Sequence, residues 1–96
     1  MRMMVKVQLD TAAANKAIKE GSLPKFIQGF IEKYKPEASY FLPEGGKRTA
    51  VFFLDMKDVA QIPALVEGWW QIGKASVSVT PAMNADDLGR GLQNLG

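Results

Sequence analysis

The chain has 96 residues, of which 47% are hydrophobic and 23% are charged, a balance typical of a single globular domain. Its twelve basic and ten acidic side chains leave a formal net charge of +2, which without clustering does not indicate nucleic acid or an anionic membrane as a partner. Cysteine and histidine are both absent, which excludes disulfides, thiolate metal sites and the commonest general base.

The N-terminal third of the chain predicts a strand followed by helical structure. Apolar and polar side chains alternate over Met3–Asp10, which is the period of a strand with one buried face. Asp10 or Thr11 can cap a helix, and Gly21 with the serine after it is typical of a helix end and a new start. We therefore expect one kinked helix or two consecutive helices between Thr11 and Lys35, ending before the next proline.

The middle of the chain predicts a β-hairpin. Glu37–Leu42 has the composition of a short strand, and Pro43–Gly46 has that of a turn. Arg48–Asp55 has the strongest strand pattern, because large apolar residues follow one another without interruption. Such a run is typical of a strand that is covered on both faces.

A second helical segment follows the hairpin. Asp58 and Gln61 have the spacing of a capping box, which predicts where the helix begins. Pro63 is early enough to bend this helix without ending it. Gly68 and Gly73 are expected at its frayed C-terminal end.

A last strand and a short helix complete the predicted elements. Ala75–Thr80 alternates apolar with polar side chains, and Asn84 can cap a turn that carries three leucines. The order strand, helix, hairpin, helix, strand is that of the split β-α-β motif. We therefore expect one α+β domain over residues 1–96, ferredoxin-like, with a four-stranded antiparallel sheet. A signal sequence and a membrane span are not expected, so we predict a cytoplasmic protein.

In this arrangement both helices cover one face of the sheet and leave the other open. Alternation places Lys6, Gln8 and Ser78 on the open face, together with either Phe52 or Phe53. Leaving a large apolar side chain in water forgoes about 1.5–3 kcal/mol. Something should therefore cover this face, and a second copy of the chain is the commonest solution for a soluble protein.

Trp69 and Trp70 are adjacent on the predicted helix. Neighbouring residues on a helix lie about 100° apart, so both indoles cannot face the same core. We expect one to pack internally and the other to reach a partner or the mouth of a pocket.

Four segments of the chain together carry a likeness to known proteins. They are Lys35–Phe41, Gly46–Ala50, Ile62–Ala64 and Thr80–Asn84. With them the chain resembles a group of uncharacterised small bacterial proteins, which is similar to the dimeric α/β-barrel superfamily of muconolactone isomerases and antibiotic-biosynthesis monooxygenases. The resemblance implies a homodimeric barrel with a ligand cavity between sheet and helices. Several enzymes of that superfamily use histidine, which this chain lacks, so no catalytic residue carries over.

The residues that could bind a ligand combine basic, amide, hydroxyl and aromatic side chains. They are Lys6, Gln8, Tyr40, Arg48, Phe52, Ser78 and Trp69. Together they predict a site for a small, partly aromatic metabolite, which would be anionic if the basic side chains bind it. The alternative interpretation is structural: Lys6 pairs with a carboxylate, and Arg48 lies exposed at the start of a strand.

Two other functions stay open at this point. Glu37, Asp55 or Glu67 could act as the general base of a cofactor-free isomerase or monooxygenase, provided that burial raises the pKa of that carboxyl. A non-catalytic oligomerisation subunit would instead fill its interface with side chains. We expect no cofactor and no metal; the carboxylates of Asp86 and Asp87 are explained by the dipole of the last helix.

Nucleic acid is not expected as a partner. An RNA-recognition sheet needs aromatic side chains on its open face, in its first and third strands. The first strand of this chain has none, and Thr49 and Ala50 occupy the positions where that signature has glycine and an aromatic residue.

Overall fold

The computed structural model describes all 96 residues of the chain. The elements follow in the order β1 (Arg2–Gln8), α1 (Thr11–Lys19), α2 (Ser22–Tyr34), β2 (Ala38–Glu44), β3 (Lys47–Asp55), the 3-10 turn η1 (Val59–Gln61), α3 (Ile62–Gly73), β4 (Ser76–Pro81) and α4 (Ala85–Gln93). The predicted α+β class and the predicted four-stranded antiparallel sheet are both confirmed.

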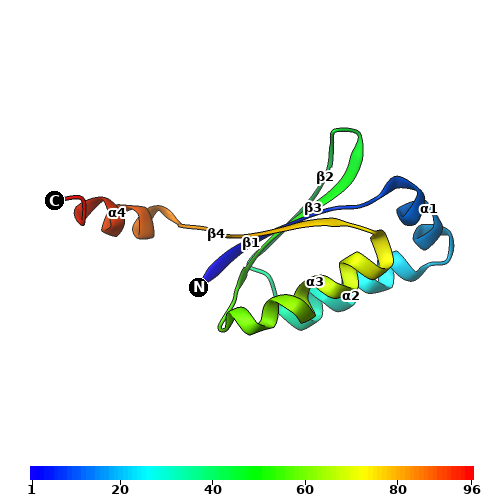
Figure 1. The fold of residues 1–96 in the computed structure, drawn as a ribbon, viewed down its shortest axis with the longest axis horizontal. Coiled ribbons are helices and arrows are strands. Elements are labelled where there is room, and N and C mark those ends of the chain that lie inside the picture. The colour runs from blue at the N-terminus through cyan, green and yellow to red at the C-terminus, as the bar shows by residue number, and fades with distance from the viewer.

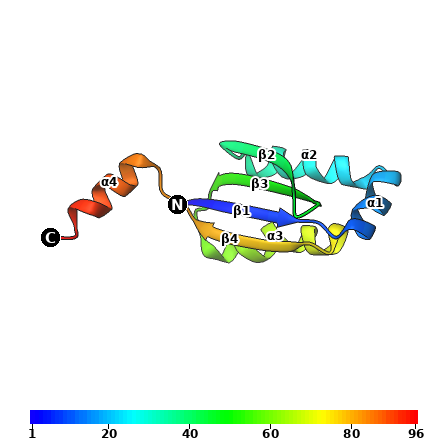
Figure 2. The ribbon, with the colours of Figure 1, turned by 90° about the horizontal axis from the view of Figure 1, so that it is seen from above.

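The sheet has the strand order β2-β3-β1-β4, and every neighbouring pair is antiparallel. Helices α2 and α3 lie side by side across one face of this sheet, and α1 lies at the end where β1 finishes (Figure 1). Seen from above, the strands lie over α2 and α3, and no element covers the opposite face (Figure 2).

Local capping chemistry explains where the first two helices begin and end. The Asp10 side chain accepts a hydrogen bond of 3.0 Å from the N–H of Ala13, as expected for an N-cap. Gly21 has a φ of 75°, a left-handed conformation that glycine adopts without strain, and it separates α1 from α2. The segment therefore forms two consecutive helices rather than one kinked helix.

In the second helical segment the predicted N-terminal cap is confirmed, but the predicted roles of Pro63 and Gly68 are wrong. Asp58 and Gln61 form the capping box. Pro63 does not bend a helix, because residues 59–61 are a 3-10 turn and the proline lies in the first turn of α3. Gly68 is not at a frayed end: a Cβ at this position would lie 2.6 Å from the ring of Phe26. Glycine here leaves room for the Phe26 ring of α2 against α3.

The core lies between the sheet and the two covering helices, and aromatic side chains form its centre. Trp69 and Phe52 are fully buried, with ring centroids 5.8 Å apart, and Phe30 lies 4.7 Å from Phe52. Phe26 packs edge-to-face on Trp69 at 4.7 Å. Trp70 is 50% exposed, so the prediction that only one of the two indoles is internal is confirmed.

The open face of the sheet is apolar in its middle and polar around it. Phe53 and Val51 lie on this face, half-buried, whereas Phe52 points into the core. The Lys6 ammonium lies 2.7 Å from a Glu44 carboxylate oxygen. Tyr40 is 61% exposed beside Val51, so the apolar middle of this face is in contact with water in a single chain.

Helix α4 extends beyond the end of the sheet, away from the other helices (Figures 1 and 2). Asn84 caps it, accepting from the N–H of Asp87 at 2.8 Å, and the Asp87 carboxylate accepts from the N–H of Asn84 at 3.1 Å. None of the residues of α4 is buried. None of the helices has both the length and the apolar composition that crossing a membrane requires.

Candidate functional site

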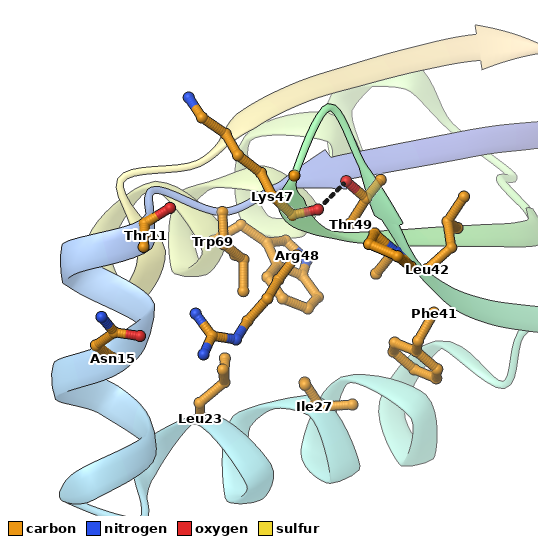
Figure 3. Close-up of a pocket in the computed structure, with 14 residues that line it drawn as sticks. Thr11, Asn15, Leu23, Ile27, Phe41, Leu42, Lys47, Arg48, Thr49 and Trp69 are labelled. Carbon is orange, nitrogen blue, oxygen red and sulfur yellow. Dashed lines mark hydrogen bonds between the residues drawn. The ribbon is translucent and has the colours of Figure 1, made fainter.

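A cleft of about 620 Å³ opens between the sheet and the helices at the hairpin end of the molecule. Its walls come from the end of β1, from α1, α2 and α3, and from the hairpin strands β2 and β3. Segments far apart in the sequence therefore meet there, as Figure 3 shows. Cavities of this size suit a small organic molecule.

Arg48 enters this cleft because of the register of β3. Arg48, Ala50 and Phe52 share the strand face that points toward the helices, whereas Thr49 and Val51 share the open face. The Arg48 side chain runs from the strand toward Leu23 of α2 (Figure 3). The alternation of side chains along β3, and not an ion pair with a neighbouring charge, therefore places Arg48 on the cleft side of the strand.

The guanidinium of Arg48 has no hydrogen-bond or ion-pair partner in the chain. None of the side-chain hydrogen bonds or salt bridges includes it, and the lining of the cleft contains no aspartate or glutamate. Lys47 also lines the cleft, but its ammonium points away from Arg48 (Figure 3). An arginine fork without a carboxylate is free to bind an anion from solution.

The rest of the cleft offers apolar contact and a few polar groups. Leu23 and Ile27 of α2 face Arg48 across the cleft, and Phe41 forms an aromatic wall (Figure 3). Thr11 and Asn15 of α1 add a hydroxyl and an amide on one side. A molecule with one anionic end and an apolar or aromatic body would match this lining.

Trp69 is a second unpartnered donor among the residues that line the cleft. Its indole Nε1 is buried and has no hydrogen-bond partner. A buried N–H without an acceptor costs about 1–3 kcal/mol, and native structures keep few of them.

The structure divides the predicted binding residues between two faces of the sheet. Arg48 and Trp69 line the cleft, and Phe52 packs against Trp69 beneath it. The other four predicted residues lie on the open face: Lys6, Gln8, Tyr40 and Ser78. Lys6 pairs with Glu44, which was the structural alternative for this residue. Arg48 is exposed near the start of β3, as its structural alternative predicted, although it also lines the cleft.

Several lining residues were not predicted as site residues. Leu23 and Ile27 belong to the apolar stripe of α2, and such a stripe is the ordinary pattern of core residues, so periodicity does not single them out as site residues. Phe41 was predicted only as part of a strand. Thr11 and Asn15 carry no sequence signal, because polar residues on a surface helix are common.

The three carboxylates considered as general bases lie outside the cleft. Glu37 pairs with Arg2, and this hydrogen bond is the main cause that raises the pKa of Arg2. Asp55 accepts from the N-terminal ammonium at 2.8 Å, which lowers its carboxyl pKa and makes it a weaker base than an ordinary aspartate. Glu67 is exposed on α3 and accepts from Gln71 at 3.1 Å.

A shallower apolar groove continues from the cleft along α2. It lies between this helix and β2, and we call it the α2–β2 groove: Leu23, Pro24, Ile27, Gln28, Ile31, Glu32 and Phe41. The groove shares Leu23, Ile27 and Phe41 with the cleft. The two hollows therefore form one continuous depression beneath the edge strand.

The comparisons with known proteins give no further constraint. No protein-family model, no curated protein and no solved structure matches the chain.

Proposed function

We propose that this protein binds a small, partly aromatic anion in the cleft beside Arg48, as a homodimer of the dimeric α/β-barrel kind. The observation that carries the proposal is the unpartnered Arg48 guanidinium in a largely apolar cleft. Arginine presents a planar fork that matches the two oxygens of a carboxylate. The apolar wall opposite requires the rest of the ligand to be apolar.

The charge of the cleft favours a monoanion over a phosphorylated metabolite. Arg48 is the one cationic group directed into it, and the Lys47 ammonium points away. A phosphate ester carries about two negative charges at neutral pH and is bound in most proteins by several donors or by a helix N-terminus. An aromatic or branched-chain carboxylate is therefore the class of ligand that we propose.

The sheet supports the ferredoxin-like part of the proposal. The order β2-β3-β1-β4, antiparallel throughout, is compatible with two interleaved β-α-β units. The half-buried Val51 and Phe53, with exposed Tyr40, give the open face the apolar middle that a second sheet could cover. A face-to-face pair of such sheets would place the two clefts on the outer, helical sides.

The acid–base alternative receives no support from the cleft. No carboxylate lines it, and Glu37, Asp55 and Glu67 lie elsewhere with other partners. Turnover by an isomerase or monooxygenase mechanism thus stays a prediction from the sequence, and we propose binding rather than catalysis.

A titration followed by NMR tests the proposal directly. Salicylate, phenylacetate and 4-methylvalerate serve as probes, and the indole N–H signals of Trp69 and Trp70 report on two adjacent residues. We expect the Trp69 signal to shift, because Trp69 is buried directly beneath the cleft, and the signal of the half-exposed Trp70 to stay unchanged. The Arg48→Met substitution should weaken binding about tenfold or more, because a charge-assisted hydrogen bond is lost.

The matched control removes a cation from the other face of the sheet. Lys6→Met should leave probe binding unchanged, because Lys6 is engaged with Glu44 on the open face. If Lys6→Met abolishes binding while Arg48→Met does not, the site lies on the open face and the proposal is wrong. If none of the probes shifts either indole, the oligomerisation-subunit alternative is favoured.

A further inference from the structure

Helix α4 presents a continuous apolar face that nothing in its own chain covers. Leu88 is 47% exposed, Leu92 is 55% exposed and Leu95, just beyond the helix, is 80% exposed. Their spacing of four and three residues places them on one side of the helix. The only ion pair between α4 and the rest of the chain joins Asp87 to Arg2 at 3.2 Å.

Such a helix has little stability of its own. It has nine residues, and Gly89 and Gly91 each lower helix stability by about 1 kcal/mol relative to alanine. Isolated helices shorter than about 12–15 residues are marginal in water even with better sequences. The capping box fixes where α4 begins, but packing of its leucine face must supply most of its stability.

The other concentration of exposed apolar side chains lies on the edge strand β2. Tyr40, Phe41 and Leu42 are 61%, 55% and 39% exposed. Phe41 also borders the α2–β2 groove, where Leu23, Ile27 and Ile31 follow at four-residue spacing. An apolar row of this spacing on one helix can pack against the leucine row of another.

The same chain cannot bring these two surfaces together in this structure. β4, which leads to α4, and β2 are opposite edges of the sheet. Helix α4 points away from the sheet and the covering helices in both views (Figures 1 and 2). The leucine face and the groove are therefore both left uncovered in a single chain.

We infer that α4 is an arm that docks its leucine face into the α2–β2 groove of a second copy. In a dimer with a two-fold axis, the arm of each copy can dock into the groove of the other. Both apolar surfaces are then covered, and the assembly closes without forming a filament. The charges agree with this occupant. The groove carries Glu32, and α4 carries Arg90 in its last turn, where it also pairs with Asp87 of its own helix.

The inference deepens the proposed function, and it rests on the proposed homodimer. Leu23, Ile27 and Phe41 line both the groove and the cleft. The arm of one copy would therefore form an outer wall of the cleft in the other. Ligand access would then depend on the partner's arm.

Cross-linking tests the arm, because the natural chain contains no cysteine. Leu92→Cys and Phe41→Cys chains are co-expressed and treated with a short bis-maleimide, so that a 92–41 link can form only between copies. We expect a product of twice 10.5 kDa containing this link. It should form about tenfold faster than with Gln93→Cys, which lies on the polar side of α4, because docked thiols have a high effective concentration.

Three results would overturn the inference. The first is a 92–41 link that forms no faster than the link with the Gln93→Cys control. The second is an equally fast link in the Leu92→Cys chain alone, which would mean that two arms pair with each other. The third is a monomer at micromolar concentration. Failure of the arm is distinguishable from failure of the proposed function. If the cross-link fails while Arg48→Met still weakens salicylate binding, the cleft proposal stands without the arm.

Discussion

Two glycines within helices, Gly29 in α2 and Gly68 in α3, have opposite surroundings. A Cβ at Gly29 would meet nothing within 4 Å, whereas one at Gly68 would lie 2.6 Å from two atoms of the Phe26 ring. We expect Gly29→Ala to raise the free energy of unfolding by about 0.5–1 kcal/mol through helix propensity. Gly68→Ala should lower it by about 1–2 kcal/mol, because Phe26 must leave its edge-to-face contact with Trp69.

Urea unfolding of the two variants and the natural chain measures this difference. The slope of the transition should be the same in all three, since none changes the surface exposed on unfolding. Equal stabilisation by both alanines would mean that the Phe26 ring moves away from Gly68 easily. In that case glycine would not be needed for the packing of Phe26 on α3.

At the scale of single residues, the sequence predicts which side chains point inward better for the helices than for β3. The 100° step between Trp69 and Trp70 requires one internal indole, and the structure buries Trp69. In β3 the uninterrupted run of apolar residues allows either register. The side on which Arg48 lies could therefore not be predicted, and it depends on how Phe52 packs against Phe30 and Trp69.

At the scale of elements, the first turn of α4 is stabilised by the carboxylate of Asp87. The hydrogen bond from the N–H of Asn84 is the main cause that lowers the pKa of Asp87, and Arg90 and Arg2 add to it. A lowered pKa means that this contribution is complete above the pKa of an unfolded aspartate, about 4, and is lost as the pH falls through the lower folded value. We expect the amides of α4 to exchange faster with deuterium as the pH falls through this window, after correction for intrinsic exchange.

The Asp87→Ala variant should show the fast exchange of α4 already at neutral pH. Asp86→Ala is the matched control, because it removes a carboxylate from the same turn that makes no hydrogen bond in the structure. Equal effects of the two substitutions would mean that Asp87 acts only through the helix dipole and not through the capping box.

The boundaries of helices were predicted well, because capping depends on residues close in the sequence. The boundaries of strands were predicted less well, because they depend on pairing with a neighbouring strand. Asp10, Asp58 and Asn84 each act on N–H groups two or three residues away, so sequence alone indicates them. β2 was expected to end at Leu42, before a turn beginning at Pro43. It continues to Glu44, because β2 is an edge strand and a proline there need not donate a hydrogen bond to a neighbour.

At the scale of the whole molecule, the proposed dimer makes a prediction for Val51. This residue lies between Tyr40 and Lys6 on the open face. If a second sheet covers this face, Val51→Lys buries an unpaired charge, which costs several kcal/mol. We expect the dimer dissociation constant, measured by sedimentation, to rise about 100-fold or more.

The control for this experiment places the same charge on the exposed turn before α3. Val59 is 69% exposed, so Val59→Lys should leave dimerisation unchanged. A monomer in the natural chain, or an unchanged dissociation constant in Val51→Lys, would contradict face-to-face packing of the sheets. The open face would then need a different cover.

The order of the elements predicted the α+β class and the antiparallel sheet, because short connections leave few ways to pair four strands. The candidate site could be predicted only in part. Its lining combines α1, α2, β2, β3 and α3, and the cleft exists because these distant segments meet at the hairpin end. Composition suggested an anion and an aromatic wall, but it could not show that Arg48 and Lys6 lie on opposite faces of the sheet.

The neighbouring indoles of α3 also give the chain an internal optical probe. Trp69 is sealed among Phe26, Phe30 and Phe52, whereas half of Trp70 faces water. Tryptophan emission moves to longer wavelength in polar surroundings, so the fluorescence of this protein combines a blue component from the core with a red component from the surface. A soluble quencher such as acrylamide reaches only the red one. Events in the core and on the surface of α3 can therefore be followed separately in an unlabelled protein.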